Sequence, residues 1–115
     1  MQIHILEGKR RKGRTEQLLK QFLEFGAGYA AFIVINEQEA KRIKHLIYLK
    51  NNKDFIDKTK DIYTWDQILN RTYIIGTNYK TLFIDNLDIM LTYFFQDKQV
   101  FATTLNNSIT VNKLQ

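Results

Sequence analysis

The segment Ala31-Phe32-Ile33-Val34-Ile35 contains only apolar side chains, with no alternation of apolar and polar residues. Strands of this kind are covered on both faces, which is typical of a parallel sheet with helices on either side. Glycines at positions 26 and 28 precede the segment, and residues 37–50 follow it with apolar residues at helical spacing. The centre of the chain therefore predicts a buried strand followed by a helix, as in an α/β fold.

Strands and helices alternate in the same way toward both ends of the chain. Residues 2–6 predict a short strand, and residues 15–25 predict a helix with one apolar stripe. Beyond the centre, residues 81–84 predict a second buried strand, residues 87–95 a helix, and residues 100–104 a further strand. We therefore expect a three-layer, open and mostly parallel sheet of about four to five strands with flanking helices.

Two other regions have less regular patterns. Residues 62–64 predict a short strand, residues 65–69 a short helix, and residues 76–78 a turn. The tail, residues 107–115, is expected to return as a hairpin through Asn106-Asn107, to form a short extra strand, or to fray.

The composition indicates one small domain and excludes several kinds of site. A chain of 115 residues with 44% hydrophobic residues fits a single domain, residues 1–115. Its apolar runs are far shorter than the ~18 residues of a membrane span, and no signal-peptide pattern follows Met1, so we expect a soluble, cytoplasmic protein without a membrane partner. The absence of cysteine excludes disulfides and thiolate zinc sites, and two histidines are too few for a metal cluster. Any metal ion therefore needs oxygen ligands.

The net charge of +5 is concentrated in one short stretch. Five of the 17 basic residues lie together, namely Lys9, Arg10, Arg11, Lys12 and Arg14, and the other 12 balance 12 acidic residues. A charge localised in this way indicates a local anion site, with phosphate as the leading candidate.

The basic stretch lies in a glycine-bounded loop between the first predicted strand and the first predicted helix. It reads Gly8-Lys9-Arg10-Arg11-Lys12-Gly13-Arg14-Thr15 and fits the pattern G-x-x-x-x-G-[K/R]-T. Such a loop can wrap phosphates because its backbone N–H groups point inward, its glycines allow unusual backbone angles, and the following helix adds positive potential.

This loop resembles the phosphate-binding loop of the P-loop nucleoside-triphosphatase superfamily. The resemblance implies that residues 8–15 all contact a nucleotide, that Thr15 is a Mg²⁺ ligand, and that Arg14 takes the place of the loop lysine. The implied cofactor is Mg²⁺ with ATP or GTP.

A second motif, Leu82-Phe83-Ile84-Asp85, follows about 70 residues later. It resembles the apolar strand of the same superfamily that ends in a magnesium-holding acid, which implies a metal role for Asp85. Residues 100–104 resemble the next strand of RecA-like and helicase-like cores, which implies a γ-phosphate sensor at Thr104, with Thr103 and Asn106 as alternatives.

Two departures from the superfamily pattern predict weak or absent hydrolysis. Arg14 replaces the compact ammonium group of lysine by a planar guanidinium. Asn86 stands where many relatives have a glutamate that activates water, and an amide cannot accept a proton. Glu37, after the central strand, is the best substitute for a catalytic base, and Asp88 is a second candidate.

Simpler interpretations remain open for the same residues. Thr15 and the Asp85-Asn86 pair could serve only as helix caps. Residues 9–12 could form a basic loop that contacts the backbone of a nucleic acid.

The function we expect is that of a nucleotide-binding protein, with slow hydrolysis at most, accessory to DNA replication, recombination or packaging. The alternatives are a pseudo-ATPase module that docks on a host or viral ATPase, and a binder of DNA or RNA backbone. The size and the composition, rich in Lys, Asn and Ile, resemble proteins of bacteriophages and mobile genetic elements. A homo-oligomer is also expected, because P-loop domains commonly complete their site with a cation from a neighbour.

Overall fold

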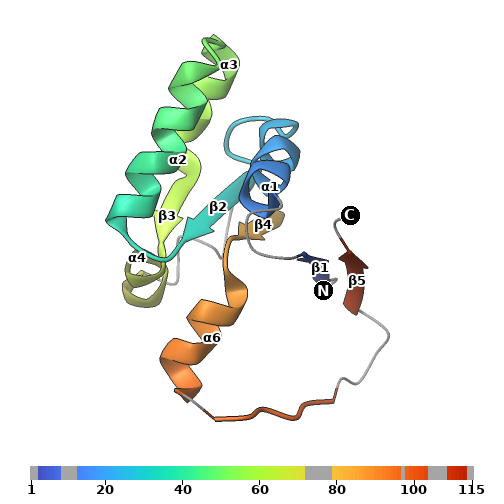
Figure 1. Ribbon diagram of the computed structural model, residues 1–115. Coiled ribbons are helices and arrows are strands. Elements are labelled where there is room, and N and C mark those ends of the chain that lie inside the picture. The colour runs from blue at the N-terminus through green and yellow to red at the C-terminus, as the bar shows by residue number, and fades with distance from the viewer. Residues whose placement is uncertain (1–2, 9–12, 72–78, 97, 104–108, 114–115) are drawn as a thin grey trace.

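The computed structural model describes residues 3–8, 13–71, 79–96, 98–103 and 109–113, and Figure 1 shows the arrangement of the elements. In chain order they are β1 (Ile3–Glu7), α1 (Arg14–Leu23), β2 (Ala30–Val34), α2 (Glu37–Leu49), α3 (Lys53–Ile56), the 3₁₀ helix η1 (Asp57–Asp61), β3 (Ile62–Thr64), α4 (Trp65–Asn70), β4 (Thr81–Ile84), α6 (Leu87–Phe95) and β5 (Ile109–Lys113).

The strands are parallel, and they form two sheets among the described residues. One sheet has the order β3-β2-β4, in which Phe32 of β2 lies opposite Ile62 and Phe83. The other sheet pairs β1 with β5. The α/β class, the parallel pairing and the extra strand in the tail are thus confirmed. The expected single sheet of four to five strands is wrong, because no described residue forms a ladder between β1 and β4.

The three-stranded sheet lies between two layers of helices. On β2, Ala30, Phe32 and Val34 face one side and pack in a hydrophobic cluster with α1 and α2. Ile33 faces the other side and packs with Ile68 of α4 and Met90 of α6. Each of the five residues of β2 is buried, which explains the absence of polar alternation in this segment.

Local side-chain contacts determine where several helices begin and end. Asn36 caps α2 by accepting a hydrogen bond from the Glu39 N–H at 2.9 Å, and Thr64 and Gln67 form a capping box at α4. After α1, the buried Lys58 ammonium donates to the carbonyls of Phe22 and Phe25. Lys58 belongs to η1, which follows the short helix α3, and neither helix was predicted from the sequence.

The region after α6 differs most from expectation. Residues 100–103 belong to no strand, and the Phe101 side chain is 91% exposed. A strand needs a neighbouring ladder and a covering layer, and the described residues provide neither at this point. The hairpin expected near residues 106–107 is also wrong, because β5 pairs in parallel with β1 instead of returning along its own chain. The turn predicted at residues 76–78 lies outside the described residues.

Candidate functional site

Thr15 and Asp85, predicted as the two metal ligands, lie in direct contact. The Thr15 hydroxyl donates to Oδ1 and Oδ2 of Asp85 at 3.0 and 3.1 Å. Thr15 is in the first turn of α1, and Asp85 directly follows β4. The backbone N–H of Asp85 donates to the Ile33 carbonyl at 3.0 Å, which holds it beside the end of β2. The contact therefore lies at the carboxyl ends of the parallel strands, where open α/β sheets bind ligands.

Neither Thr15 nor Asp85 is the N-cap residue of a helix, so a capping role is wrong for these two residues, whereas Asn86 of the Asp85-Asn86 pair does take an N-cap position. The N-cap of α1 is Gly13, and that of α6 is Asn86. Asn86 makes no side-chain capping bond; its amide instead donates to Oδ2 of Asp85 at 3.3 Å. The Thr15 and Asp85 side chains bond each other instead, between the start of α1 and the end of β4.

Burial makes the Asp85 carboxylate an unusually costly charge. Its side chain is only 5% exposed, and this burial raises its pKa above the ordinary value. The Thr15 hydrogen bond and the positive charges of Arg42 and Arg14 oppose the rise, and the negative charge of Glu39 adds to it. Among the described residues, no Lys or Arg forms an ion pair with Asp85. A cation bound beside this carboxylate would relieve the cost of its burial.

The two side chains fit the requirements of Mg²⁺. Hydroxyl and carboxylate oxygens are hard ligands, and adjacent ligands of an octahedron with bonds of about 2.1 Å lie about 3 Å apart. The 3.0 Å between Thr15 Oγ1 and Asp85 Oδ1 matches this edge. The described residues contain no cluster of three or more potential metal ligands among His, Cys, Asp and Glu. Mg²⁺ commonly takes one or two protein oxygens and fills its other positions with water and phosphate.

Comparisons with protein-family models, curated proteins and solved structures find no significant match. In the part of the chain that the structure describes, no helix is both long and apolar enough to cross a membrane.

The structure shows part of the predicted phosphate loop. Gly8 is half-buried directly after β1, and Gly13 has φ 75°, a left-handed conformation that favours glycine. Arg14 follows as the first residue of α1, half-buried and close enough for its charge to act on Asp85. Lys9, Arg10, Arg11 and Lys12 lie outside the described residues, and so does the predicted sensor Thr104.

Sequence reasoning missed two charged residues near the site. Glu37, the predicted base, is exposed in the first turn of α2 and makes no side-chain hydrogen bond with described residues. The charges that act on Asp85 from α2 are instead those of Glu39 and Arg42. Arg42 donates through Nε and Nη2 to one oxygen of Glu39, at 3.0 and 2.9 Å. The sequence could have indicated this pair, because Glu39 and Arg42 are three residues apart in the helix that follows a buried strand. Such a helix begins at the edge of the sheet where Asp85 also lies.

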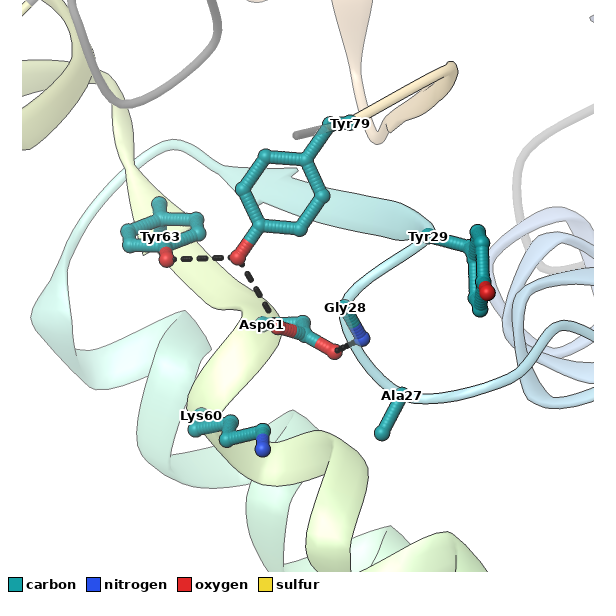
Figure 2. Close-up of a pocket in the computed structure, with 7 residues that line it drawn as sticks. All are labelled: Ala27, Gly28, Tyr29, Lys60, Asp61, Tyr63 and Tyr79. Atoms are coloured by element: carbon teal, nitrogen blue, oxygen red, sulfur yellow. Dashed lines mark hydrogen bonds between the residues drawn. The ribbon is translucent and has the colours of Figure 1, made fainter. Parts of the chain in front are cut away.

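A second polar cluster lies at the opposite edge of the sheet, where the strands begin (Figure 2). Asp61 accepts hydrogen bonds from the Gly28 N–H and the Tyr79 hydroxyl, both at 2.8 Å. Since the Tyr79 proton is engaged with Asp61, the Tyr63 hydroxyl is the donor in the 2.7 Å contact with Tyr79. These groups line an open pocket of about 590 Å³ together with Ala27, Tyr29 and Lys60. The Gly28 N–H and the Tyr63 and Tyr79 hydroxyls all donate within this cluster. We therefore interpret the cluster as structural, because its hydrogen bonds connect the starts of β2, β3 and β4.

Proposed function

We propose that the protein binds a nucleoside triphosphate together with Mg²⁺ at the carboxyl edge of the sheet, and that it hydrolyses the nucleotide slowly or not at all. The observation that carries the proposal is the contact between Thr15 and Asp85. These residues occur in two separate motifs, and a shared site would require them to meet in space. The proposal also includes an accessory role in DNA replication, recombination or packaging, for which only the resemblance of the sequence argues.

Each residue of the site has a distinct role in this proposal. The Thr15 hydroxyl and the Asp85 carboxylate would hold Mg²⁺, which neutralises negative charge on the phosphate oxygens when it is bound. Arg14 would supply a fixed positive charge at the start of α1, where the helix end already favours anions. Gly13 permits the left-handed turn that leads the loop into the helix.

The geometry supports slow turnover because no well-placed base is present among the described residues. The amide of Asn86 is engaged with Asp85 and cannot accept a proton. The Glu39 carboxylate acts on Asp85 through its charge, but its side chain is engaged with Arg42 in an ion pair. Glu37 remains a candidate base and would have to reach the site from the exposed first turn of α2.

Thermal unfolding with and without ligand tests the binding. ATP, GTP and their non-hydrolysable analogues are each added with Mg²⁺ or with chelator. A ligand at about a hundredfold excess over its Kd stabilises the fold by about 2.7 kcal/mol, so the melting temperature should rise clearly and only with Mg²⁺. Thr15→Val should abolish the shift. Thr59→Val is the matched control, because the Thr59 hydroxyl donates to the nearby Ile56 carbonyl and lies outside the proposed site.

The absence of any shift with millimolar ATP, GTP or deoxynucleotides would contradict the proposal. Titration with DNA and RNA at several salt concentrations then separates the two alternatives. Binding with a log–log salt slope of about −3 to −5 would favour contact between the basic loop and a nucleic-acid backbone. No binding would leave the pseudo-ATPase module as the remaining interpretation, with a host or viral ATPase as its partner.

A further inference from the structure

Helix α2 begins beside the buried carboxylate of Asp85. The Asp85 N–H donates to the Ile33 carbonyl at 3.0 Å, and Asn36, three residues after Ile33, is the N-cap of α2. Three residues span at most about 11 Å, so the start of the helix stays near the carboxylate. In Figure 1, the chain passes from the tip of β2 directly into α2. The ion pair of Glu39 and Arg42 therefore lies at the same edge of the sheet as the proposed metal ligands.

The positive charge of Arg42 acts on this edge. Burial raises the pKa of Asp85, and among the positive charges that oppose the rise, Arg42 acts more strongly than Arg14. Arg14 is the residue next to Thr15 in the chain and belongs to the predicted phosphate loop. Arg42 is therefore at least as effective a cation for an anion at this edge as a residue of that loop.

The guanidinium of Arg42 uses only part of its capacity to form hydrogen bonds. Its Nε and Nη2 groups both donate to one oxygen of Glu39, Oε2, at 3.0 and 2.9 Å. Nη1 of Arg42 and Oε1 of Glu39 make no hydrogen bond with described residues. A guanidinium fork matches two oxygens of one carboxylate or phosphate group, so pairing on a single oxygen leaves the better arrangement unused.

The ion pair is also weak enough to be exchanged. The Arg42 side chain is 48% exposed, the Glu39 side chain is 28% exposed, and the two residues are three positions apart on one helix. Exposed pairs of this kind contribute little to stability, because water screens the attraction. A phosphate group is a stronger partner for arginine, since its charged oxygens fit both arms of the fork.

We propose that Arg42 is a phosphate-binding residue of the nucleotide site and that Glu39 competes with the nucleotide for its guanidinium. The inference rests on the proposed function, because the phosphate belongs to the bound nucleotide. Binding replaces the single Glu39 oxygen on the fork by two phosphate oxygens and leaves the Glu39 carboxylate to water. Arg42 therefore raises the affinity for nucleotide, and Glu39 lowers it.

Titration of the protein with Mg²⁺ and fluorescent, non-hydrolysable analogues of ATP and GTP tests the role of Arg42. Arg42→Gln should weaken binding about 10- to 100-fold, since hydrogen bonds between charged groups are strong. Arg42→Lys should lose less, because it keeps the charge but not the fork. Lys41→Gln is the matched control, because it removes the same charge from the neighbouring exposed position of α2, and it should change the affinity less than about 2-fold.

A double-mutant cycle tests the competition with Glu39. Glu39→Gln should strengthen binding about 2- to 5-fold, the range expected when an exposed ion pair no longer opposes the ligand. In the Arg42→Gln background the same substitution should have little effect, because no guanidinium remains to be released. A general effect of charge predicts equal gains in both backgrounds.

The outcomes separate this inference from the proposed function. Circular dichroism establishes that each variant is folded, and Arg42→Lys takes the place of Arg42→Gln if the latter does not fold. Nucleotide binding that is unchanged by substitution of Arg42, or is reduced equally by Lys41→Gln, would overturn the inference and leave the proposed function standing. Equal gains from Glu39→Gln in both backgrounds would also overturn it. Absence of binding by the wild type would overturn both.

Discussion

The Thr15 hydroxyl donates to both carboxylate oxygens of Asp85, at 3.0 and 3.1 Å, although the two residues are 70 positions apart in the chain. The contact joins the start of α1 to the end of β4. The buried carboxylate accepts hydrogen bonds from two neutral side chains, Thr15 and Asn86, and forms no ion pair among the described residues. An arrangement of this kind costs stability in the free protein and favours the binding of a cation.

We predict that Thr15→Val destabilises the protein even without ligand. The variant keeps the shape of the side chain but removes the hydroxyl, and the buried Asp85 carboxylate loses the hydrogen bonds that Thr15 donates. The expected loss in the free energy of unfolding is about 1–3 kcal/mol. Urea denaturation measures it, and Thr15→Ser should lose much less because it retains the donor. Equal stability of the valine variant and the wild type would show that the contact is not formed in solution.

We predict that Tyr79→Phe destabilises the protein more than Tyr63→Phe. Tyr79 both donates to Asp61 and accepts from Tyr63, whereas Tyr63 stands at the end of the chain of hydrogen bonds. Removing the Tyr79 hydroxyl leaves the 2% exposed Asp61 with one donor fewer, at a cost of about 1–3 kcal/mol. Removing the Tyr63 hydroxyl should cost about 1 kcal/mol or less. The reverse order in denaturant unfolding would contradict the assigned direction of donation.

We predict that Lys58 makes the stability depend on pH in the alkaline range. Burial lowers the pKa of Lys58 below 10.5, and the charge of Asp61 only partly opposes this. Between the lowered value and 10.5 the unfolded chain binds the proton more strongly than the folded chain, so the free energy of unfolding should rise with pH. Below the lowered pKa, the full cost of the buried charge is present.

Comparison of Lys58→Met with the wild type isolates this effect. Burial and the hydrogen bonds with Tyr63 and Asp61 raise the pKa of Tyr79, which acts in the opposite direction but is common to both proteins. The free energy of unfolding of the wild type should therefore rise relative to that of Lys58→Met as the pH approaches 10.5. Lys60→Met, at an exposed neighbouring position, should show no such change. A difference that stays constant with pH would mean that the Lys58 pKa is not lowered.

We predict nucleotide turnover well below the ~1 to 10³ s⁻¹ of typical enzymes. If slow hydrolysis is measured, Glu37→Gln and Glu39→Gln identify its base, because each removes one carboxylate while sparing Thr15 and Asp85. Loss of turnover with retained binding in one variant assigns the role to that residue. Steady-state phosphate release at typical enzymatic rates would refute the argument from Arg14 and Asn86.

Local patterns were sufficient to predict most elements of this chain. The apolar segment at residues 31–35 indicated a strand buried on both faces, and the structure buries Phe32 and Ile33 on opposite sides of β2. Helix spacing, glycine stops and short β-branched runs predicted α1, α2, α4, α6, β1, β3 and β4, because these signals act over a few residues. The resemblance to the P-loop superfamily implied that Thr15 and Asp85 serve the same site, and the structure places the two side chains in contact.

Long-range pairing was decided only by the tertiary structure. Whether residues 100–103 or residues 109–113 become a strand depends on which segment finds a partner, and β1 pairs with the latter. The placement of Glu39 and Arg42 near Asp85 depends on the direction that α2 takes after β2. The exposure of the apolar side chains of α6 depends on which other elements pack against this helix. Sequence patterns specify which faces of an element are apolar. They do not specify the neighbour that buries each face, because that neighbour comes from a distant part of the chain or from another molecule.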